Sequence, residues 1–360
     1  MSIIATYVYV SRDGGGDGSS DAYTMSFADA LRFRGGSDDL IVVDATVSAA
    51  DLNALDASTD GTVVTEPYVT TVTGSLPDVA AAYGSSGISG LGDETVALDD
   101  TTVAAADLLA LDTATSGGID ASSVTTVTGS LSDVATAYAS SGISGLGNAA
   151  VTLDDTTAAA ADLNALAAFT SGTIDASSVT TVTGSLSDVG AAYASSGISG
   201  LGNAAVILDD TTVAAADLNA LDALTSGVID ASSVTTLMGS LSDVATAYAS
   251  SEISGLGNAV VTLDDATVAA GDLNALDAAT NGTIDASSVT TLTGSLSAVA
   301  MALSSYGIML DLDEAVTLDD TTVAAGDLNA LDAVTNGTID ASSVTTLTGS
   351  LSAVAMALSS

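Results

Sequence analysis

The sequence repeats itself at a fixed spacing. The triplet Gly-Ser-Leu recurs with a period of about 55 residues, beginning at Gly74, Gly129, Gly184, Gly239, Gly294 and Gly349. Self-similarity at a fixed period is typical of stacked architectures, in which each unit buries its apolar face only against its neighbours. Because such an array lengthens without enlarging its cross-section, the 360 residues are expected to form one continuous body rather than several globular domains.

Each repeat contains two segments with helical periodicity. In residues 185–193, the apolar side chains of Leu186, Val189 and Tyr193 fall on one face of a 3.6-residue helix. Ser185 precedes them as a candidate N-cap, and Gly197 is expected to end the helix in a left-handed conformation. Residues 212–222 show a second, narrower apolar stripe, which predicts a second helix.

The segments 173–183 and 205–208 are rich in β-branched residues and are predicted to be extended. The order strand, helix, strand, helix divides each repeat into two coils of about 27 residues, near the length of a leucine-rich repeat. The predicted fold class is therefore α/β: a right-handed strand-helix solenoid with leucine-rich-repeat-like coils, whose parallel sheet is backed by short helices. An all-β solenoid is the alternative.

The ends of the sequence depart from this pattern. Residues 1–24 are predicted to form an N-terminal capping strand and an acidic Gly/Ser loop, and residues 25–360 a continuous solenoid with two coils per repeat. The last helical segment is not followed by the strand that comes next in other repeats. This predicts either truncation from a longer array or completion by the N-terminal strand of another copy, which would propagate as a head-to-tail homopolymer.

Charge limits the possible partners. There are 45 acidic and three basic residues, giving a net charge of −42, and the bases are Arg12, Arg32 and Arg34. A chain without basic side chains beyond Arg34 cannot neutralise phosphates, which excludes nucleic acids and anionic lipid surfaces as expected partners. Divalent cations are expected instead. Apolar runs stay short of the ~18 residues of a membrane span, so no direct membrane insertion is expected.

The composition also argues against an enzyme. Cys, His and Lys, which commonly supply nucleophiles and bases, are absent. An active site is normally a single departure from regularity, whereas the acidic residues here recur in register. We therefore expect a non-enzymatic protein that requires no cofactor.

Paired acids close one strand of each repeat and are the candidate metal ligands. They are expected to cap the helix that follows, since a carboxylate accepts N–H bonds and favours the positive end of the helix dipole. The alternative is Ca²⁺, which takes carboxylate and carbonyl oxygens from such turns. The pairs are Asp99 and Asp100, Asp154 and Asp155, Asp209 and Asp210, Asp264 and Asp265, and Asp319 and Asp320.

Two further columns of polar residues recur. The first is the Thr-x-Thr pattern, as at Thr126 and Thr128, which reflects β-propensity or, as an alternative, an ice-binding hydroxyl ladder with rungs in every second coil. The second column, which is expected to fill the core, consists of Tyr83, Tyr138, Tyr193 and Tyr248.

The strings Asp-Leu-Asn-Ala-Leu-Asp, Val-Thr-Thr-Val-Thr-Gly-Ser-Leu-Ser-Asp-Val and Ser-Gly-Ile-Ser-Gly-Leu-Gly-Asn-Ala carry a resemblance. They resemble repeats of very long acidic surface proteins of marine bacteria, cyanobacteria especially, over roughly residues 40–360. The resemblance implies an extracellular or cell-surface structural protein, as part of a filament or surface layer. It has no active-site motif to transfer. A surface binding module or adhesin for glycan, protein or ice, with calcium-dependent stability, is the alternative.

Overall fold

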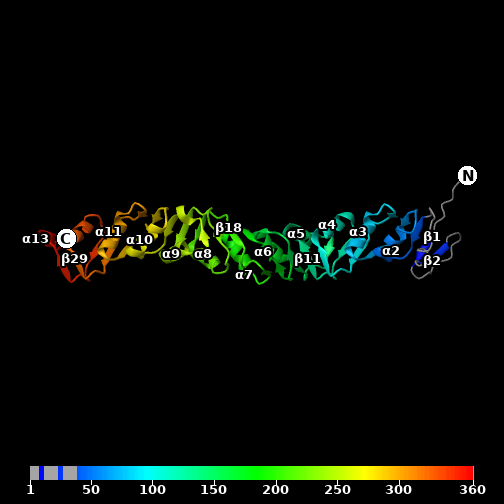
Figure 1. Cartoon of the computed structure of the whole chain (residues 1–360), viewed down its shortest axis with the longest axis horizontal. Helices are drawn as coiled ribbons and strands as arrows, with labels where there is room; N and C mark the ends of the chain where they lie inside the picture. Colours follow the sequence, from blue (N-terminus) through cyan, green and yellow to red (C-terminus); the bar gives the residue numbers. More distant parts are fainter. Residues whose placement is uncertain (1–7, 12–22, 27–38, 360) are drawn as a thin grey trace. The chain divides into compact units, whose positions relative to one another are not determined.

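The computed structural model describes residues 8–11, 23–26 and 39–359. They fall into two compact units, each built from the same kind of coil (Figure 1). Unit 1 comprises Met1–Thr156, Asp162–Val179 and Ser196–Gly200, and unit 2 comprises Thr157–Ala161, Thr180–Ser195 and Leu201–Ser360. Of the predicted N-terminal cap, the described parts are the paired parallel strands β1 (Val8–Ser11) and β2 (Tyr23–Ser26). The Gly/Ser loop lies outside the described residues.

The helices are of two kinds. The first kind follows each Gly-Ser-Leu triplet, and the N-cap serine accepts the N–H three residues ahead, as Ser185 does from Asp188 at 3.1 Å. This confirms the helix predicted at residues 185–193. The first kind comprises α3 (Leu76–Gly84), α5 (Leu131–Ala139), α7 (Leu186–Ala194), α9 (Leu241–Ala249), α11 (Leu296–Ser304) and α13 (Leu351–Ala357). The second comprises α2 (Ala49–Asp56), α4 (Ala105–Ala114), α6 (Ala160–Phe169), α8 (Ala215–Asp222), α10 (Ala270–Ala279) and α12 (Ala325–Asp332), and a 3-10 turn, η1, spans Leu256–Asn258.

The repeats supply five kinds of short strand. Strands that lead into a second-kind helix are β4 (Thr46–Ser48), β9 (Thr102–Ala104), β14 (Thr157–Ala159), β19 (Thr212–Ala214), β24 (Thr267–Ala269) and β29 (Thr322–Ala324). Strands that lead into a first-kind helix are β6 (Thr71–Gly74), β11 (Thr126–Gly129), β16 (Thr181–Gly184), β21 (Thr236–Gly239), β26 (Thr291–Gly294) and β31 (Thr346–Thr348).

The other three kinds lie in the turns between helices. One precedes the paired acids: β8 (Thr95–Leu98), β13 (Ala150–Leu153), β18 (Ala205–Leu208), β23 (Val260–Leu263) and β28 (Ala315–Leu318), with β3 (Leu40–Val42) in the same position. A second is β5 (Val63–Val64), β10 (Ile119–Asp120), β15 (Ile174–Asp175), β20 (Ile229–Asp230), β25 (Ile284–Asp285) and β30 (Ile339–Asp340). The third is β7 (Ile88–Ser89), β12 (Ile143–Ser144), β17 (Ile198–Ser199), β22 (Ile253–Ser254) and β27 (Ile308–Met309).

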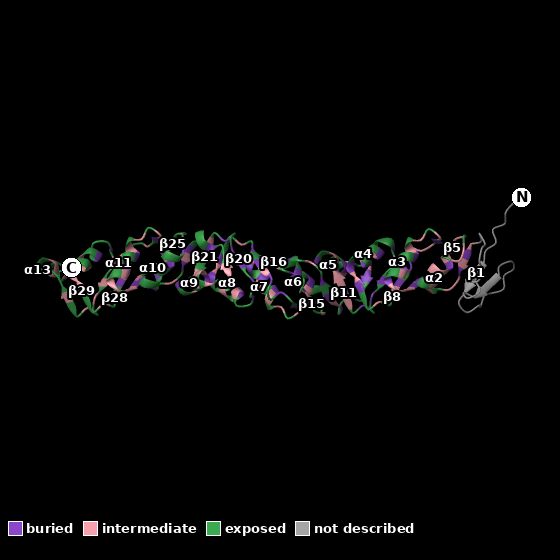
Figure 2. Ribbon diagram, in the orientation of Figure 1, coloured by how far each residue is buried: buried purple, intermediate pink, exposed green. Residues whose placement is uncertain are grey.

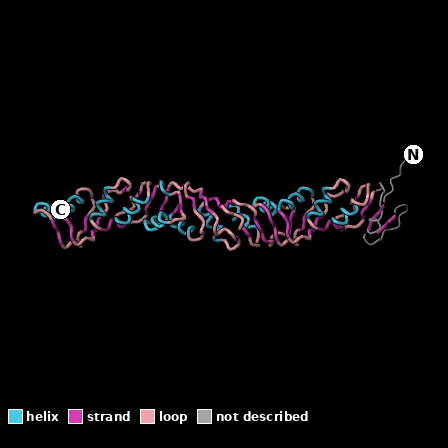
Figure 3. The backbone as a smooth tube through the Cα atoms, viewed as in Figure 1, coloured by secondary structure: helices cyan, strands magenta, loops and turns pink. Residues whose placement is uncertain are grey.

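These strands pair in parallel and in a constant order. In unit 1 the sheets run β2-β1-β3-β5-β7, β4-β6-β8-β10-β12 and β9-β11-β13-β15-β17. In unit 2 they run β14-β16-β18-β20-β22, β19-β21-β23-β25-β27, β24-β26-β28-β30 and β29-β31. Within a unit, paired strands lie side by side and helices form the rest of each coil (Figure 3). The fold is therefore the predicted α/β solenoid of repeating strand-helix units, consistent with right-handed, leucine-rich-repeat-like coils.

One coil is shorter than the predicted length of about 27 residues. Thr102 pairs with Thr126 and Thr212 with Thr236, which are 24 residues apart, and the other strand pairs from β3 to β31 have spacings of 23–25 residues. Two coils of 24 residues contain 48 residues, about seven fewer than the repeat of about 55. Equivalent helices in successive repeats are therefore displaced by about seven residues along the coil. This shift limits the length of a sheet: the residue one coil length after Ile253 in β22 is Asp277, which lies in α10.

Three local predictions differ from the structure. Residues 212–214 form the strand β19 rather than the first turn of a helix, because β-branched side chains suit the ladder that Thr212 and Val213 form with the next coil. The turn after α7 places its left-handed residue at Gly200, with a φ of 93°, because Ser195 already leaves the helix in an extended conformation. The predicted strand 173–183 is two strands, β15 and β16, separated by a turn.

The core is a thin layer of aliphatic side chains. Figure 2 shows buried residues distributed along both units, with exposed positions between them. In a typical coil pair, Val206, Leu208, Leu218 and Leu221 are at most 1% exposed. Burying each such side chain contributes about 1.5–3 kcal/mol, and much of the contact comes from neighbouring coils. A single coil is therefore not expected to be stable alone.

Candidate functional site: the recurrent acidic turns

The second acid of each pair reaches across to a helix in the preceding coil. Its Oδ2 accepts the backbone N–H of the first residue of a first-kind helix, 24 residues earlier in the sequence. The bonds are each 2.6 Å long and join Leu76 to Asp100, Leu131 to Asp155, Leu186 to Asp210, Leu241 to Asp265 and Leu296 to Asp320. The paired acids are therefore helix caps that connect one coil to the next.

The predicted partner of this cap was wrong. The paired acids were expected to cap the helix that follows them, but α8 and α10 begin after Ala214 and Ala269, whose side chains make no capping bond. Parallel stacking explains the difference: a strand that precedes a pair of acids, such as β23, pairs with a strand that leads into a first-kind helix, such as β21, so the acids lie one coil beyond the start of that helix. The sequence shows which residue is a cap, whereas the three-dimensional register selects the helix that receives it.

The first acid of each pair has a different environment. Asp99, Asp154, Asp209, Asp264 and Asp319 are exposed, and their backbone N–H groups donate to the Gly carbonyl that precedes the capped helix, for example Asp264 to Gly239 at 3.3 Å. Within residues 8–11, 23–26 and 39–359, no group of three or more acidic side chains is arranged to hold a metal ion. Calcium binding at the pairs stays a prediction.

We expect Asp265→Ala to lower the free energy of unfolding by about 0.5–2 kcal/mol, the usual cost of losing a helix N-cap. The matched change Asp264→Ala removes the same charge one residue away without removing a capping bond, and it should cost under about 0.5 kcal/mol. Urea unfolding followed by circular dichroism measures both. Equal losses in the two variants would contradict the cross-coil cap.

The tyrosine column is half-buried, and its hydroxyl groups tie helices to neighbouring turns. Tyr138 donates to the carbonyl oxygen of Ala149 at 3.1 Å and Tyr193 to that of Ala204 at 3.2 Å. In the first repeat, Tyr83 donates instead to the Glu94 carboxylate at 3.1 Å. Burial raises the pKa of these phenols above the ordinary value, and for Tyr83 the negative charge of Glu94 adds to the effect.

The raised pKa values predict instability in alkali. A phenol whose pKa is higher in the folded than in the unfolded chain stabilises the fold fully below about pH 10. That contribution is lost as pH rises through the folded pKa. In a triple variant with Tyr138, Tyr193 and Tyr248 changed to Phe, the Tm should therefore fall less between pH 9 and pH 11.5 than it does in the unchanged protein. Parallel curves of Tm against pH for the two proteins would be evidence against this role.

The threonine rows differ from the predicted spacing of every second coil. Thr102 pairs with Thr126 and Thr128 pairs with Thr152, so threonines lie on neighbouring strands of one sheet. Some of the hydroxyl groups in these rows are used internally: Thr128 donates to the carbonyl oxygen of Val103 at 3.4 Å, and Thr293 donates to that of Val268 at 3.4 Å. Each row ends within one sheet, because no sheet in the described ranges exceeds five strands.

Comparison with known proteins adds no family to this description. No protein-family model matches the sequence, and no match is found among curated proteins. Among the helices that the structure describes, none has both the length and the apolar character needed to cross a bilayer. The fold and the acidic turns thus define the class of the protein as an acidic strand-helix solenoid.

Proposed function

We propose that this protein is a non-enzymatic structural protein of the cell surface, acting as a subunit or segment of an extracellular filament or surface layer. The observation that carries the proposal is the use of the recurrent polar residues in stacking. The second acid of each pair caps a helix in the preceding coil, the N-cap serines bond to the first turns of the first-kind helices, and the tyrosine column bonds to neighbouring turns. Chemistry that recurs in every repeat in this way favours a scaffold over a catalyst. The extracellular location is supported by the resemblance described above.

End-to-end association is part of the proposal. Among the described residues, β30 and β31 are edge strands of the sheets β24-β26-β28-β30 and β29-β31, and an edge strand accepts a further parallel strand. A contact of this type does not close on itself and propagates as a filament. Negative-stain electron microscopy at about 0.15 M salt tests this, with filaments expected. Separate particles, each the length of a single chain, at every protein concentration would exclude polymerisation.

We also propose that cations, Ca²⁺ among them, control the lateral association of neighbouring molecules. With a net charge of −42, neighbouring molecules repel each other unless salt screens them over a distance of about 8 Å at physiological ionic strength. Bundling is therefore expected to require salt or divalent ions. A calcium-stabilised fold should lose Tm in excess EDTA, and an unchanged Tm would remove calcium from the proposal.

A further inference from the structure

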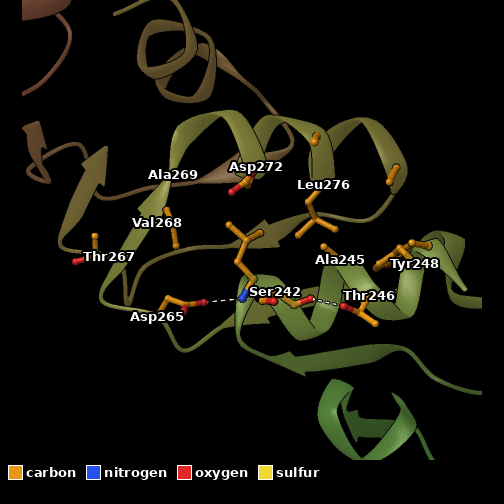
Figure 4. Close-up of a pocket in the computed structure, with 14 residues that line it drawn as sticks. Ser242, Ala245, Thr246, Tyr248, Asp265, Thr267, Val268, Ala269, Asp272 and Leu276 are labelled. Carbon is orange, nitrogen blue, oxygen red and sulfur yellow. Dashed lines mark hydrogen bonds between the residues drawn. The ribbon is translucent and has the colours of Figure 1, made fainter. Parts of the chain in front are cut away.

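Open grooves lie between the helices of unit 2. One groove, of about 670 Å³, separates the first-kind helix α9 from the second-kind helix α10, and another of about 440 Å³ separates α7 from α8. Both have the same helix order and the same register, one repeat apart. Small side chains line the facing surfaces of the larger groove, among them Ala275 and Ala245, the second of which is labelled in Figure 4.

Each groove has one acidic and one apolar region. In the larger groove, Asp265 lies in the turn after β23, beside the start of α9, and Asp272 lies on α10, while Ala245, Leu276 and Tyr248 are among the other lining residues (Figure 4). Asp210 and Asp217 occupy the equivalent positions in the smaller groove. Asp272 and Asp217 are exposed and lie in the first turn of their helices.

The described chain cannot supply the counter-charge for these acids. Residues 8–11, 23–26 and 39–359 contain no Lys, Arg or His, so no ion pair forms among them. A second copy brings the same net negative charge. Charge complementarity therefore favours a partner of opposite sign, and the apolar side chains of the lining favour a positive group that is carried on a hydrocarbon stem.

We propose that these grooves bind lysine side chains of a basic protein partner. The ammonium group lies between the two aspartates of a groove, and the methylene stem packs against the alanine and leucine side chains. The two grooves lie one repeat apart in unit 2, so a partner with several lysines gains affinity by occupying both of them. This inference concerns a partner and holds whether or not the protein polymerises.

Photo-cross-linking tests the site locally. The probe is a synthetic peptide of five Lys-Gly-Ser-Gly units with a diazirine group beside each lysine, applied to the full chain at about 0.15 M salt. Mass spectrometry should place cross-links on α7–α8 and α9–α10. Changing Ala220 and Ala275 to Leu fills both grooves without altering charge, and we expect the yield there to fall about tenfold, equivalent to about 1.4 kcal/mol of binding.

Charge-matched variants separate the groove from general attraction to an acidic surface. Changing Asp217 and Asp272 to Asn should also lower the yield about tenfold, whereas changing Asp209 and Asp264 to Asn, outside the grooves, should change it less than twofold. Uniform labelling along the chain, equal effects of the two aspartate pairs, or undiminished labelling by a lysine-acetylated peptide would overturn the proposal. Self-association that is abolished by the leucine variant would assign the grooves to a second copy instead. Filament formation is scored separately by microscopy, so failure of either proposal is recognised independently.

Discussion

Replacing Gly227 with alanine is expected to destabilise unit 2 by about 3 kcal/mol or more. Gly227 is buried, and a Cβ at this position would overlap the carbonyl oxygen of Ala204 in the neighbouring coil. Because the obstacle is backbone, it cannot rotate away as a side chain could. The coils would have to separate locally, which would also disturb the hydrogen bond from the Gly227 N–H to the Thr225 hydroxyl group.

Gly271→Ala is the matched control. Gly271 lies on the exposed side of α10, and a Cβ there meets no atom within 4 Å. Alanine is favoured over glycine inside a helix by about 0.5–1 kcal/mol, so this variant should be more stable than the unchanged protein. Chemical denaturation measures both variants. If Gly227→Ala is as stable as Gly271→Ala, the coils are not packed as closely as the structure describes.

Removal of two equivalent glutamates should change stability in opposite directions. Glu94 and Glu314 occupy the position that holds Ala149, Ala204 or Ala259 in other repeats, and both are buried. The Glu94 carboxylate accepts bonds from the Gly92 N–H at 2.8 Å and the Tyr83 hydroxyl at 3.1 Å. Glu94→Ala should therefore lower the free energy of unfolding by about 1–2 kcal/mol.

Glu314 accepts a backbone hydrogen bond, as Glu94 does, but it has no bond from a tyrosine hydroxyl group in the described part of the chain. Its Oε1 accepts the Asp311 N–H at 2.8 Å, but Oε2 is buried and has no partner among the described residues, because Leu303 replaces the tyrosine. An unsatisfied buried polar group costs about 1–3 kcal/mol, so Glu314→Ala should raise stability by up to that amount.

Leu303→Tyr offers an independent repair of the same position. It supplies the missing hydroxyl donor and should also stabilise the protein. The double variant, which combines Leu303→Tyr with Glu314→Ala, should gain less than the sum of the two single changes, because either change alone removes the unsatisfied oxygen. Thermal melts of the three variants are sufficient. A loss of stability in both single variants would show that the buried oxygen is satisfied in solution.

Local patterns in the sequence predicted the elements well where one residue pattern had one structural meaning. The apolar residues of 185–193 and the serine before them define a helix and its cap without reference to the rest of the chain. Thr212 and Val213 did not, because their apolar and small neighbours also fit a helix and only pairing with Thr236 and Leu237 makes them a strand. The coil length could not be obtained by halving the repeat, since it depends on which strands pair.

The candidate sites show the same division. The paired acids were recognisable as caps or metal ligands from their position after a strand, but the helix that Asp265 caps lies in the preceding coil. The groove beside Asp272 has no signature in the sequence, because alanines on a helix indicate a close contact as readily as a gap. Glu314 could have been singled out from its alignment with three alanines, although its unpartnered oxygen depends on the loss of tyrosine at Leu303.

The stacking of coils 24 residues apart is the claim on which the other conclusions depend, and disulfide trapping measures it. The protein contains no cysteine, so pairs can be introduced without interference. Thr212 and Thr236 are direct partners on neighbouring parallel strands, whose separation of about 4.8 Å suits a disulfide. We predict that Thr212→Cys with Thr236→Cys oxidises completely, whereas Thr212→Cys with Ser240→Cys, separated by about half a repeat, does not. The reverse result would show that each coil spans half of the repeat and would contradict the stacking described above.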